Sequence, residues 1–266
     1  MIAVEMRKQA FRLRTYIAFG LMAGVPIIMT LALEFGRRPR NPDEQTFFAV
    51  ATHSGLTIPL AALTSVSTFL LVVVVSLFAG GAVSEEAGWG SLRYLLIRPV
   101  TRSRLLRDKL IVACVMSFVA TWLITISSLI AGILFFGLHP VLTPNFEVFS
   151  ESEAFYKIVI ATMYVAYCMT GIVALAFMIS TMTDTTLGAV AAGVGIVIIS
   201  EILNAITTLG NVRGFLITHH WHAWEAMFYG RGSTSDMIDG LLLQIPYVVV
   251  FLALGWWWFH RRDILA

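Results

Sequence analysis

Three histidines and a carboxylate late in the sequence form its densest group of side chains able to do chemistry. The run HHWHAWEAMFYG, residues 219–230, holds His219, His220, His222 and Glu225. Imidazole is a common metal ligand, but adjacent histidines point in different directions on a helix, and no His-x-x-x-His spacing occurs here. We assign no metal ligands to this run. Its aromatic residues favour an interfacial belt instead: Trp221, Trp224, Phe228 and Tyr229.

Glu201 is the one acidic residue well inside a long apolar run, in the stretch ISEILNAI. Lipid exposure of a carboxylate is costly, so such a group usually faces a bundle interior or a water-filled path. Asn204, three residues on, shares its helical face and is placed to hydrogen-bond with it. Both residues are therefore candidates for lining a path through the membrane. The alternative is that the apolar run ends near Ile199 and leaves Glu201 at the outer headgroups.

The glycine-rich stretch GGAVSEEAGWG, residues 80–90, does not have the features of a nucleotide site. A P-loop, G-x-x-x-x-G-K-[ST], cradles phosphates with backbone amides and reaches them with its lysine. The stretch contains no lysine, and the motif occurs nowhere in the 266 residues. We expect no ATP hydrolysis, and no other enzymatic activity, from this chain.

The composition places these residues in a membrane protein. Hydrophobic side chains make up 58% of the chain, charged ones 13%, and the mean hydropathy is +0.82. A soluble domain carries about 25% charged residues. The net charge of +2 is too small to indicate a nucleic-acid partner, and two cysteines exclude a disulfide-rich scaffold or a Cys-based metal framework. Cys114 and Cys168 are expected to be small packing residues.

Six apolar runs are long enough to cross a bilayer, which takes about 20 residues per helix. They span residues 15–33, 56–83, 110–138, 155–179, 187–207 and 238–259. Residues 1–266 are thus predicted to form a single all-α membrane domain. The glycines and alanines of the fifth run, residues 187–207, allow close helix approach, either to a partner chain or within this one.

The basic residues predict the orientation of these spans. With the N-terminus inside, twelve of the eighteen Lys and Arg residues lie on the cytoplasmic side, as the positive-inside rule requires. The six outside include the cluster Arg37, Arg38 and Arg40. The chain is therefore expected to be a multi-pass protein of the cell membrane with both termini in the cytoplasm.

The loop between the second and third spans, SEEAGWGSLRYLLIRPVTRSRLLRDK, is the most informative segment. Ser84 followed by Glu85 and Glu86 predicts a helix start, because a hydroxyl caps the first turn and acids favour the positive end of the helix dipole. Gly88 and Gly90 then interrupt the helix.

A second short helix follows in the same loop. From Ser91, an apolar stripe at helical spacing is formed by Leu92, Leu95 and Leu96. Pro99 ends this helix, and Thr101 is placed to cap the next one, which returns to the membrane. An amphipathic helix on the cytoplasmic face must bury its leucines among lipid headgroups or in a groove of another protein. The alternative is a solvated basic loop.

This loop resembles that of the ABC-2-type permeases, the membrane subunits of ABC exporters. Their pattern is an acidic pair, a glycine and a G-(S/T)-L…L-L…P-(V/L)-(S/T/G)-R…L…K stretch. The matching positions are Glu85-Glu86, Gly88, Gly90-Ser91-Leu92, Leu95-Leu96, Pro99-Val100-Thr101-Arg102, Leu105-Leu106 and Lys109. The closing WWWFHRRDILA and the basic amphipathic start are also similar to the family. Trp89, between the two glycines, departs from the pattern.

The resemblance implies a particular architecture and assembly. The basic N-terminal stretch would be an interfacial elbow helix carrying Arg7, Lys8, Arg12 and Arg14. The 91–97 helix would be a coupling helix contacting a separate ABC ATPase, which would bind the ATP and Mg²⁺. Short helices would dip into the outer leaflet before the sixth span. A second permease chain, identical or related, would complete the transporter, which would export an amphipathic or apolar substrate or move it between leaflets.

Two other functions fit the same sequence. A membrane-embedded enzyme or metal-handling assembly factor would place several polar residues at one depth, and the spans offer Glu201 with Asn204. A non-transporting immunity or sensor subunit would share the permease fold.

Overall fold

The protein is an elongated helical bundle, seen here in a computed structural model that describes residues 2–36, 47–88, 101–143, 145, 147–229 and 235–261. Six segments are long and apolar enough to cross a membrane. They are α2 (Leu13–Phe35), the segment Gly55–Gly88, α7 (Arg102–Phe136), α8 (Glu151–Met182), α9 (Thr186–Ala205) and α10 (Ser235–Arg261). Each overlaps its predicted span, so the all-α membrane fold with six spans is confirmed.

The second span is built from four consecutive helical pieces. These are η2 (Gly55–Thr57), α4 (Ile58–Val66), the π-helical η3 (Ser67–Leu71) and α5 (Val72–Gly88). The remaining elements are short: α1 (Ile2–Ala10), α3 (Phe47–Val50), η1 (Ala51–His53), β1 (Val141–Leu142), β2 (Val148–Phe149), η4 (Thr207–Phe215) and η5 (Ala223–Met227). The two strands pair antiparallel and connect α7 to α8, a small β element that the sequence did not predict.

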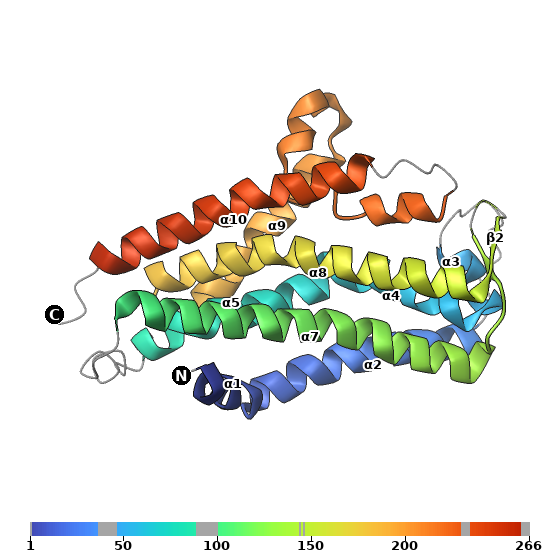
Figure 1. Cartoon of the computed structure of the whole chain (residues 1–266), viewed down its shortest axis with the longest axis horizontal. Coiled ribbons are helices and arrows are strands. Elements are labelled where there is room, and N and C mark those ends of the chain that lie inside the picture. The colour runs from blue at the N-terminus through green and yellow to red at the C-terminus, as the bar shows by residue number, and fades with distance from the viewer. Residues whose placement is uncertain are drawn as a thin grey trace.

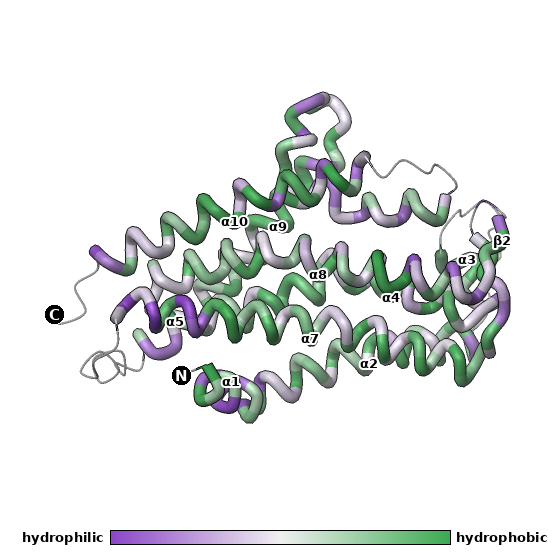
Figure 2. Tube along the Cα trace, viewed as in Figure 1, coloured by the Kyte–Doolittle hydropathy of each residue, from purple (hydrophilic) through white to green (hydrophobic). Residues whose placement is uncertain are grey.

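The second span and α8 form the centre of the bundle. In each of these two segments, 72% of the most hydrophobic 18-residue stretch is buried inside the bundle. The corresponding share is 44% for α7 and 17–22% for α2, α9 and α10. Figure 1 shows the long helices running side by side, with α1 and the end of α10 at the same end of the bundle. Hydrophilic residues gather at the two ends, and hydrophobic ones cover the shaft (Figure 2), as expected for helices with lipid around them.

Small residues and buried hydroxyls let the central helices approach closely. The backbones of Gly55 and Gly132 touch, leaving no room for a side chain at either position. Thr125 of α7 and Thr162 of α8 share a hydrogen bond of 2.9 Å between their hydroxyls. Both devices are typical of membrane helix packing, where lipid is as apolar as the side chains and hydrophobicity alone does not hold helices together.

Between α9 and α10, residues 206–229 form a folded segment rather than a simple loop, and we call this segment the excursion. The short helix η4 projects sideways from the bundle, and the chain then returns along it as η5 (Figure 1). The predicted short helices before the sixth span are thus present as 3₁₀ helices. The predicted aromatic belt is wrong for Trp221, Trp224 and Phe228, which are at most 3% exposed. They pack in the core, where Phe47 stacks on Trp224.

Candidate functional site

A network of ion pairs joins four helices at the end of the bundle where α1 lies. We call it the charged network, and its members are Glu5, Lys8, Arg12, Arg14, Glu85, Glu86 and Lys109. Glu86, 3% exposed, pairs with Lys8 of α1 and with Lys109 of α7, whose Nζ lies 2.8 Å from its carboxylate. Lys109, 2% exposed, also lies 3.2 Å from Glu5. One buried carboxylate and one buried ammonium group therefore tie α1, α5 and α7 together.

Glu85 makes the second half of the network with two arginines. It pairs with Arg12, and with Arg14 at 2.8 Å from Nη2. Arg14 also donates to Gln9 Oε1 at 3.0 Å. The Arg14 guanidinium lies against Gly81, where an added Cβ would stand 2.7 Å from Nη1. Glycine at position 81 is thus what gives the arginine room to reach Glu85.

The neighbouring residues of α5 fix the same end of this helix to α8 and α9. Ser180 of α8 accepts hydrogen bonds from the amides of Val83 and Ser84, at 3.0 and 2.9 Å. An added Cβ at Gly80 would meet Ala189 of α9 at 3.2 Å, and one at Gly88 would meet the backbone oxygen of Asp184 at 2.6 Å. The small residues of this stretch therefore serve close packing.

The structure corrects one prediction about the acidic pair. Ser84, Glu85 and Glu86 do not start a helix, because α5 begins at Val72 and runs to Gly88. The acids therefore lie at the negative end of the helix dipole, where carboxylates are unfavourable, and the four cations of the network compensate for this. The ion pairs that both acids make among the described residues lie within the chain.

Most of the predicted coupling segment falls outside the described residues. This holds for Gly90, Ser91, Leu92, Leu95, Leu96 and Pro99. The helix expected after Thr101 is present as α7, and Thr101 occupies its N-cap position, but the Thr101 side chain makes no capping hydrogen bond. Arg102 donates to the backbone oxygens of Phe259 and His260, both at 3.3 Å. It thereby binds the last carbonyls of α10, which lack partners within that helix.

A second polar cluster lies where the excursion meets the second span. His222 Nδ1 lies 3.1 Å from Glu225 Oε1, and its Nε2 lies 3.2 Å from the hydroxyl of Thr68. Thr64 also reaches Glu225 Oε1, at 3.3 Å. Thr68 is part of the π-helical η3, and single π-turns inside helices frequently mark functional positions. Sequence reasoning missed this contact between the excursion and the second span.

The charge state of His222 depends on Glu225. Burial by itself would lower the pKa of His222, but the hydrogen bond to Glu225 and its negative charge outweigh burial, so the pKa is raised. His219 behaves in the opposite way, because burial and the neighbouring His220 and Arg213 lower its pKa. Among the described residues no three His, Cys, Asp or Glu side chains are grouped as metal ligands.

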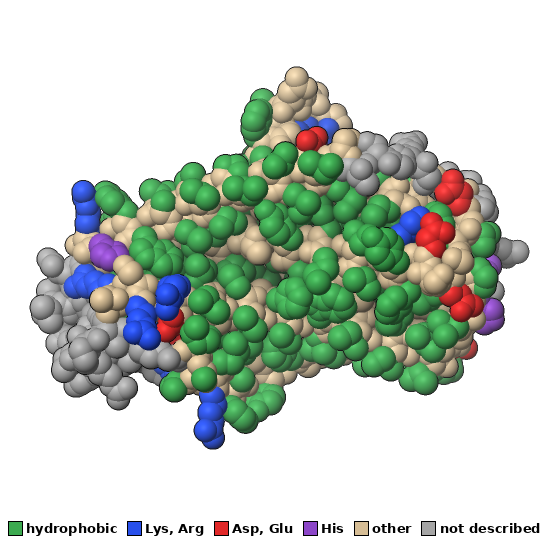
Figure 3. Space-filling model, in the orientation of Figure 1, with side chains coloured by type: hydrophobic (Ala, Val, Ile, Leu, Met, Phe, Trp, Pro, Cys, Tyr) green, Lys and Arg blue, Asp and Glu red, His purple; other side chains and the backbone are tan. Residues whose placement is uncertain are grey.

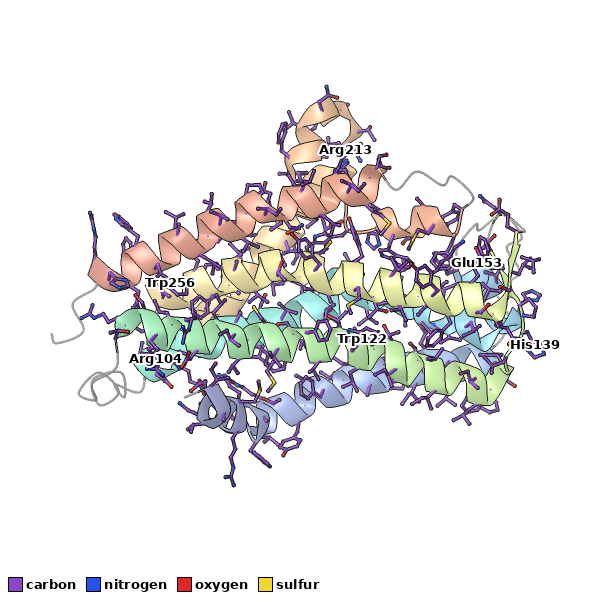
Figure 4. The ribbon with its side chains drawn as sticks, in the orientation of Figure 1. Arg104, Trp122, His139, Glu153, Arg213 and Trp256 are labelled. Carbon is purple, nitrogen blue, oxygen red and sulfur yellow. The ribbon has the colours of Figure 1, made fainter. Side chains whose placement is uncertain are left out.

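Glu201 and Asn204 lie in the last turns of α9, and both are partly buried. Asn204 Oδ1 lies 2.6 Å from Nδ1 of His219, so the excursion holds the amide that was expected to bond with Glu201. Glu201 Oε1 is shielded from solvent without a hydrogen-bond partner among the described residues. The structure brings both residues to the base of the projecting η4, which carries Arg213 (Figure 4).

The small residues of α9 have different surroundings. Gly193 lies against Ser76 of α5 and Ala176 of α8, and Ala189 lies against Gly80. Gly195 has no neighbour within 4 Å of an added Cβ. Close packing within the chain therefore explains part of the small face, and the remainder points outward. Cys114 and Cys168 are both free, with Cys168 buried, as the packing interpretation predicts.

Comparison with known proteins places the chain in a family. Residues 43–265 match the family model described as protein of unknown function, DUF2705. The chain belongs to this family. The matched range of this DUF2705 protein contains Glu85, Glu86 and Lys109 but begins after α2, so the three basic residues Lys8, Arg12 and Arg14 precede it.

Two curated relatives from Bacillus subtilis (strain 168) are similar to this DUF2705 protein. The uncharacterized membrane protein YdbK is 26% identical over 260 residues, covering 94% of this chain and 96% of YdbK. The uncharacterized protein YhcI is 21% identical over 215 residues, covering 74% of this chain and 66% of YhcI. The match to YhcI thus spans just under two thirds of that protein. The similarity to YdbK and the six apolar helices agree on a multi-pass membrane protein.

Proposed function

We propose that this chain is the permease subunit of an ABC transporter, forming the path for an amphipathic or apolar substrate that is exported or moved between leaflets. A separate ABC ATPase binds and hydrolyses ATP with Mg²⁺, and a second permease chain, identical or related, completes the assembly. The resemblance of residues 84–109 to the ABC-2-type permeases motivates the proposal. The observation that supports it best is the charged network, because its helices α5 and α7 flank residues 89–100.

The network suits the transmission of force from a cytoplasmic subunit. In the proposed mechanism, ATP-driven closure of the ATPase pushes on the coupling helix, residues 91–97. The Glu86–Lys109 pair holds the end of α5 and the start of α7 together, so the two helices move as one unit. Lys8 and Glu5 add α1 to that unit. A buried ion pair stabilises a protein only while its geometry is close to ideal, so separating α5 from α7 at the Glu86–Lys109 pair is costly. A displacement of one helix therefore moves the other.

The second span carries that displacement toward the excursion. Beyond α5, it passes through the π-helical η3, whose Thr68 contacts His222. The excursion in turn holds Asn204, next to Glu201 at the end of α9. In the proposal, Glu201 and Asn204 line the path, and movement of the second span repositions the excursion beside them.

The distribution of charge supports a cytoplasmic location for the network. In Figure 3 most of the visible Lys and Arg side chains gather at one end of the bundle, and most Asp and Glu side chains at the other. Arg104 marks the basic end, and Glu153 and His139 mark the opposite one (Figure 4). By the positive-inside rule the basic end faces the cytoplasm. Both termini are then cytoplasmic, and α1 is the interfacial elbow helix.

The test is purification of the tagged chain from the membranes of its native host. We expect a stoichiometric companion with a G-x-x-x-x-G-K-[ST] sequence, identified by mass spectrometry, and vanadate-sensitive ATP hydrolysis by the complex in lipid nanodiscs. The double variant Leu95→Asp/Leu96→Asp should lose both while still inserting in the membrane. Burying each leucine contributes about 1.5–3 kcal/mol, so the loss should exceed tenfold in affinity.

A matched control carries two aspartates at the opposite end of the bundle. Leu138 and Val148 are 50% and 66% exposed there, so Leu138→Asp/Val148→Asp should leave the companion and its activity unchanged. Absence of a P-loop protein from the wild-type complex would refute the permease proposal. Normal coupling in the Leu95/Leu96 variant would refute the coupling helix alone.

A further inference from the structure

The helix α1 has two charged faces with different surroundings. On its inward face, Met6 and Gln9 pack against the bundle, and Glu5 forms an ion pair with Lys109. Its outward face carries Val4 and Arg7, followed by Phe11 just beyond the helix. These three positions are spaced by three and four residues, so they lie on one side of the helix.

The outward side forms an open groove of about 660 Å³ lined by Ala3, Val4, Arg7, Lys8 and Phe11. Val4 is 73% exposed and Phe11 69%. The guanidinium of Arg7 lies 5.9 Å from the centre of the Phe11 ring. An exposed cation thus stands directly beside an exposed apolar surface.

Arg7 differs from the other basic residues of this region. Lys8, Arg12 and Arg14 each pair with Glu85 or Glu86. No ion pair among the described residues includes Arg7, which points outward instead. The positive charge that α1 offers to an external ligand is therefore concentrated at this one side chain, next to Val4 and Phe11.

The geometry points to a binding site for one anionic phospholipid in this groove. A guanidinium matches a phosphate with two parallel hydrogen bonds, and Val4 and Phe11 offer an acyl chain the apolar contact that a free phosphate does not use. The groove lies beside the start of α2, at the end of a membrane span, where headgroups are found. The site is independent of the proposed transport function.

The test measures bound lipid directly. The purified full-length chain is reconstituted in nanodiscs of nine parts phosphatidylcholine to one part phosphatidylglycerol, and retained lipids are counted by native mass spectrometry after controlled delipidation. We expect phosphatidylglycerol to be enriched over its share of the bilayer. Arg7→Gln should reduce that enrichment about fivefold, the ratio that corresponds to about 1 kcal/mol per basic residue near an anionic surface.

The matched control is Arg104→Gln, which removes one exposed positive charge from the same end of the bundle (Figure 4) but lies outside the groove. It should leave the enrichment unchanged. Phe11→Ser should reduce retention of both lipids, because it removes the acyl contact. Equal enrichment in the wild type and Arg7→Gln would overturn the site. An equal loss in Arg7→Gln and Arg104→Gln would also overturn it, since it would show attraction to the overall charge.

Discussion

Replacing Glu86 by glutamine isolates the central contact of the charged network. The change keeps the size of the side chain and leaves Lys109, 2% exposed, without its carboxylate at 2.8 Å. Breaking a buried ion pair by removing one partner costs about 3–5 kcal/mol. Lys109 keeps Glu5 at 3.2 Å, so we expect the lower end, about 3 kcal/mol. At 2–4 °C per kcal/mol, the melting temperature should fall by about 6–12 °C.

In the assay, samples of the detergent-solubilised chain are heated to a series of temperatures, and size-exclusion chromatography then measures how much of the chain remains folded. Glu153→Gln is the control, because Glu153 is 48% exposed and pairs with Lys157 one helical turn away, a contact that contributes about 0.3–0.5 kcal/mol. A Glu86→Gln shift no larger than that of Glu153→Gln would refute the reasoning. In the double variant Glu86→Leu/Lys109→Met both charges are gone, so stability should recover above that of Glu86→Leu alone.

Three further predictions concern other parts of the bundle. Gly81→Leu should displace Arg14 and lower the melting temperature as much as Arg14→Gln does, and the double variant should show no additional loss, because both changes break the same contact. The pKa of His222 is raised on folding, so the stability that His222 contributes is present below its unfolded pKa and is lost as pH rises through the raised value. His222→Gln should remove this pH dependence of stability from melting curves measured between pH 5 and 8. An impermeant maleimide added to intact cells should label Ser152→Cys but not Ser103→Cys, and labelling of position 103 would reverse the proposed orientation.

The membrane fold could be predicted from the sequence because its signal is strong and local. A run of about 20 apolar residues leaves few alternatives to a spanning helix, and all six were identified. Helix ends were less predictable. The second span was expected to stop at Val83, because Ser84, Glu85 and Glu86 look like a helix start. The structure continues α5 to Gly88, since contacts with α1, α7 and α8 satisfy residues that local rules place at an N-terminus.

The charged network could not be predicted because its partners are distant in sequence. Lys8 and Glu86 are 78 positions apart, and counting basic residues for orientation treats Lys8, Arg12, Arg14 and Lys109 as solvent-facing charges. One signal was present: an acidic pair and a basic stretch were both assigned to the same side of the membrane. No comparable signal pointed to the contact between His222 and Thr68. Thr68 lies in an apolar run, and the contact forms only because the excursion packs against the second span.

The position of the acids on α5 explains why α1 would belong to the moving unit of the proposed mechanism. Glu85 and Glu86 lie in the last turn of α5, where the helix dipole disfavours negative charge, and Glu86 is also buried. The end of α5 is therefore stable only with cations beside it, and α1, the start of α2 and α7 supply them. Detaching α1 would leave a buried carboxylate with Lys109 as its remaining cation in the network, at a cost of several kcal/mol. Any displacement of the 89–100 segment that moves α5 must then carry α1 with it, along with whatever α1 binds on its outward face.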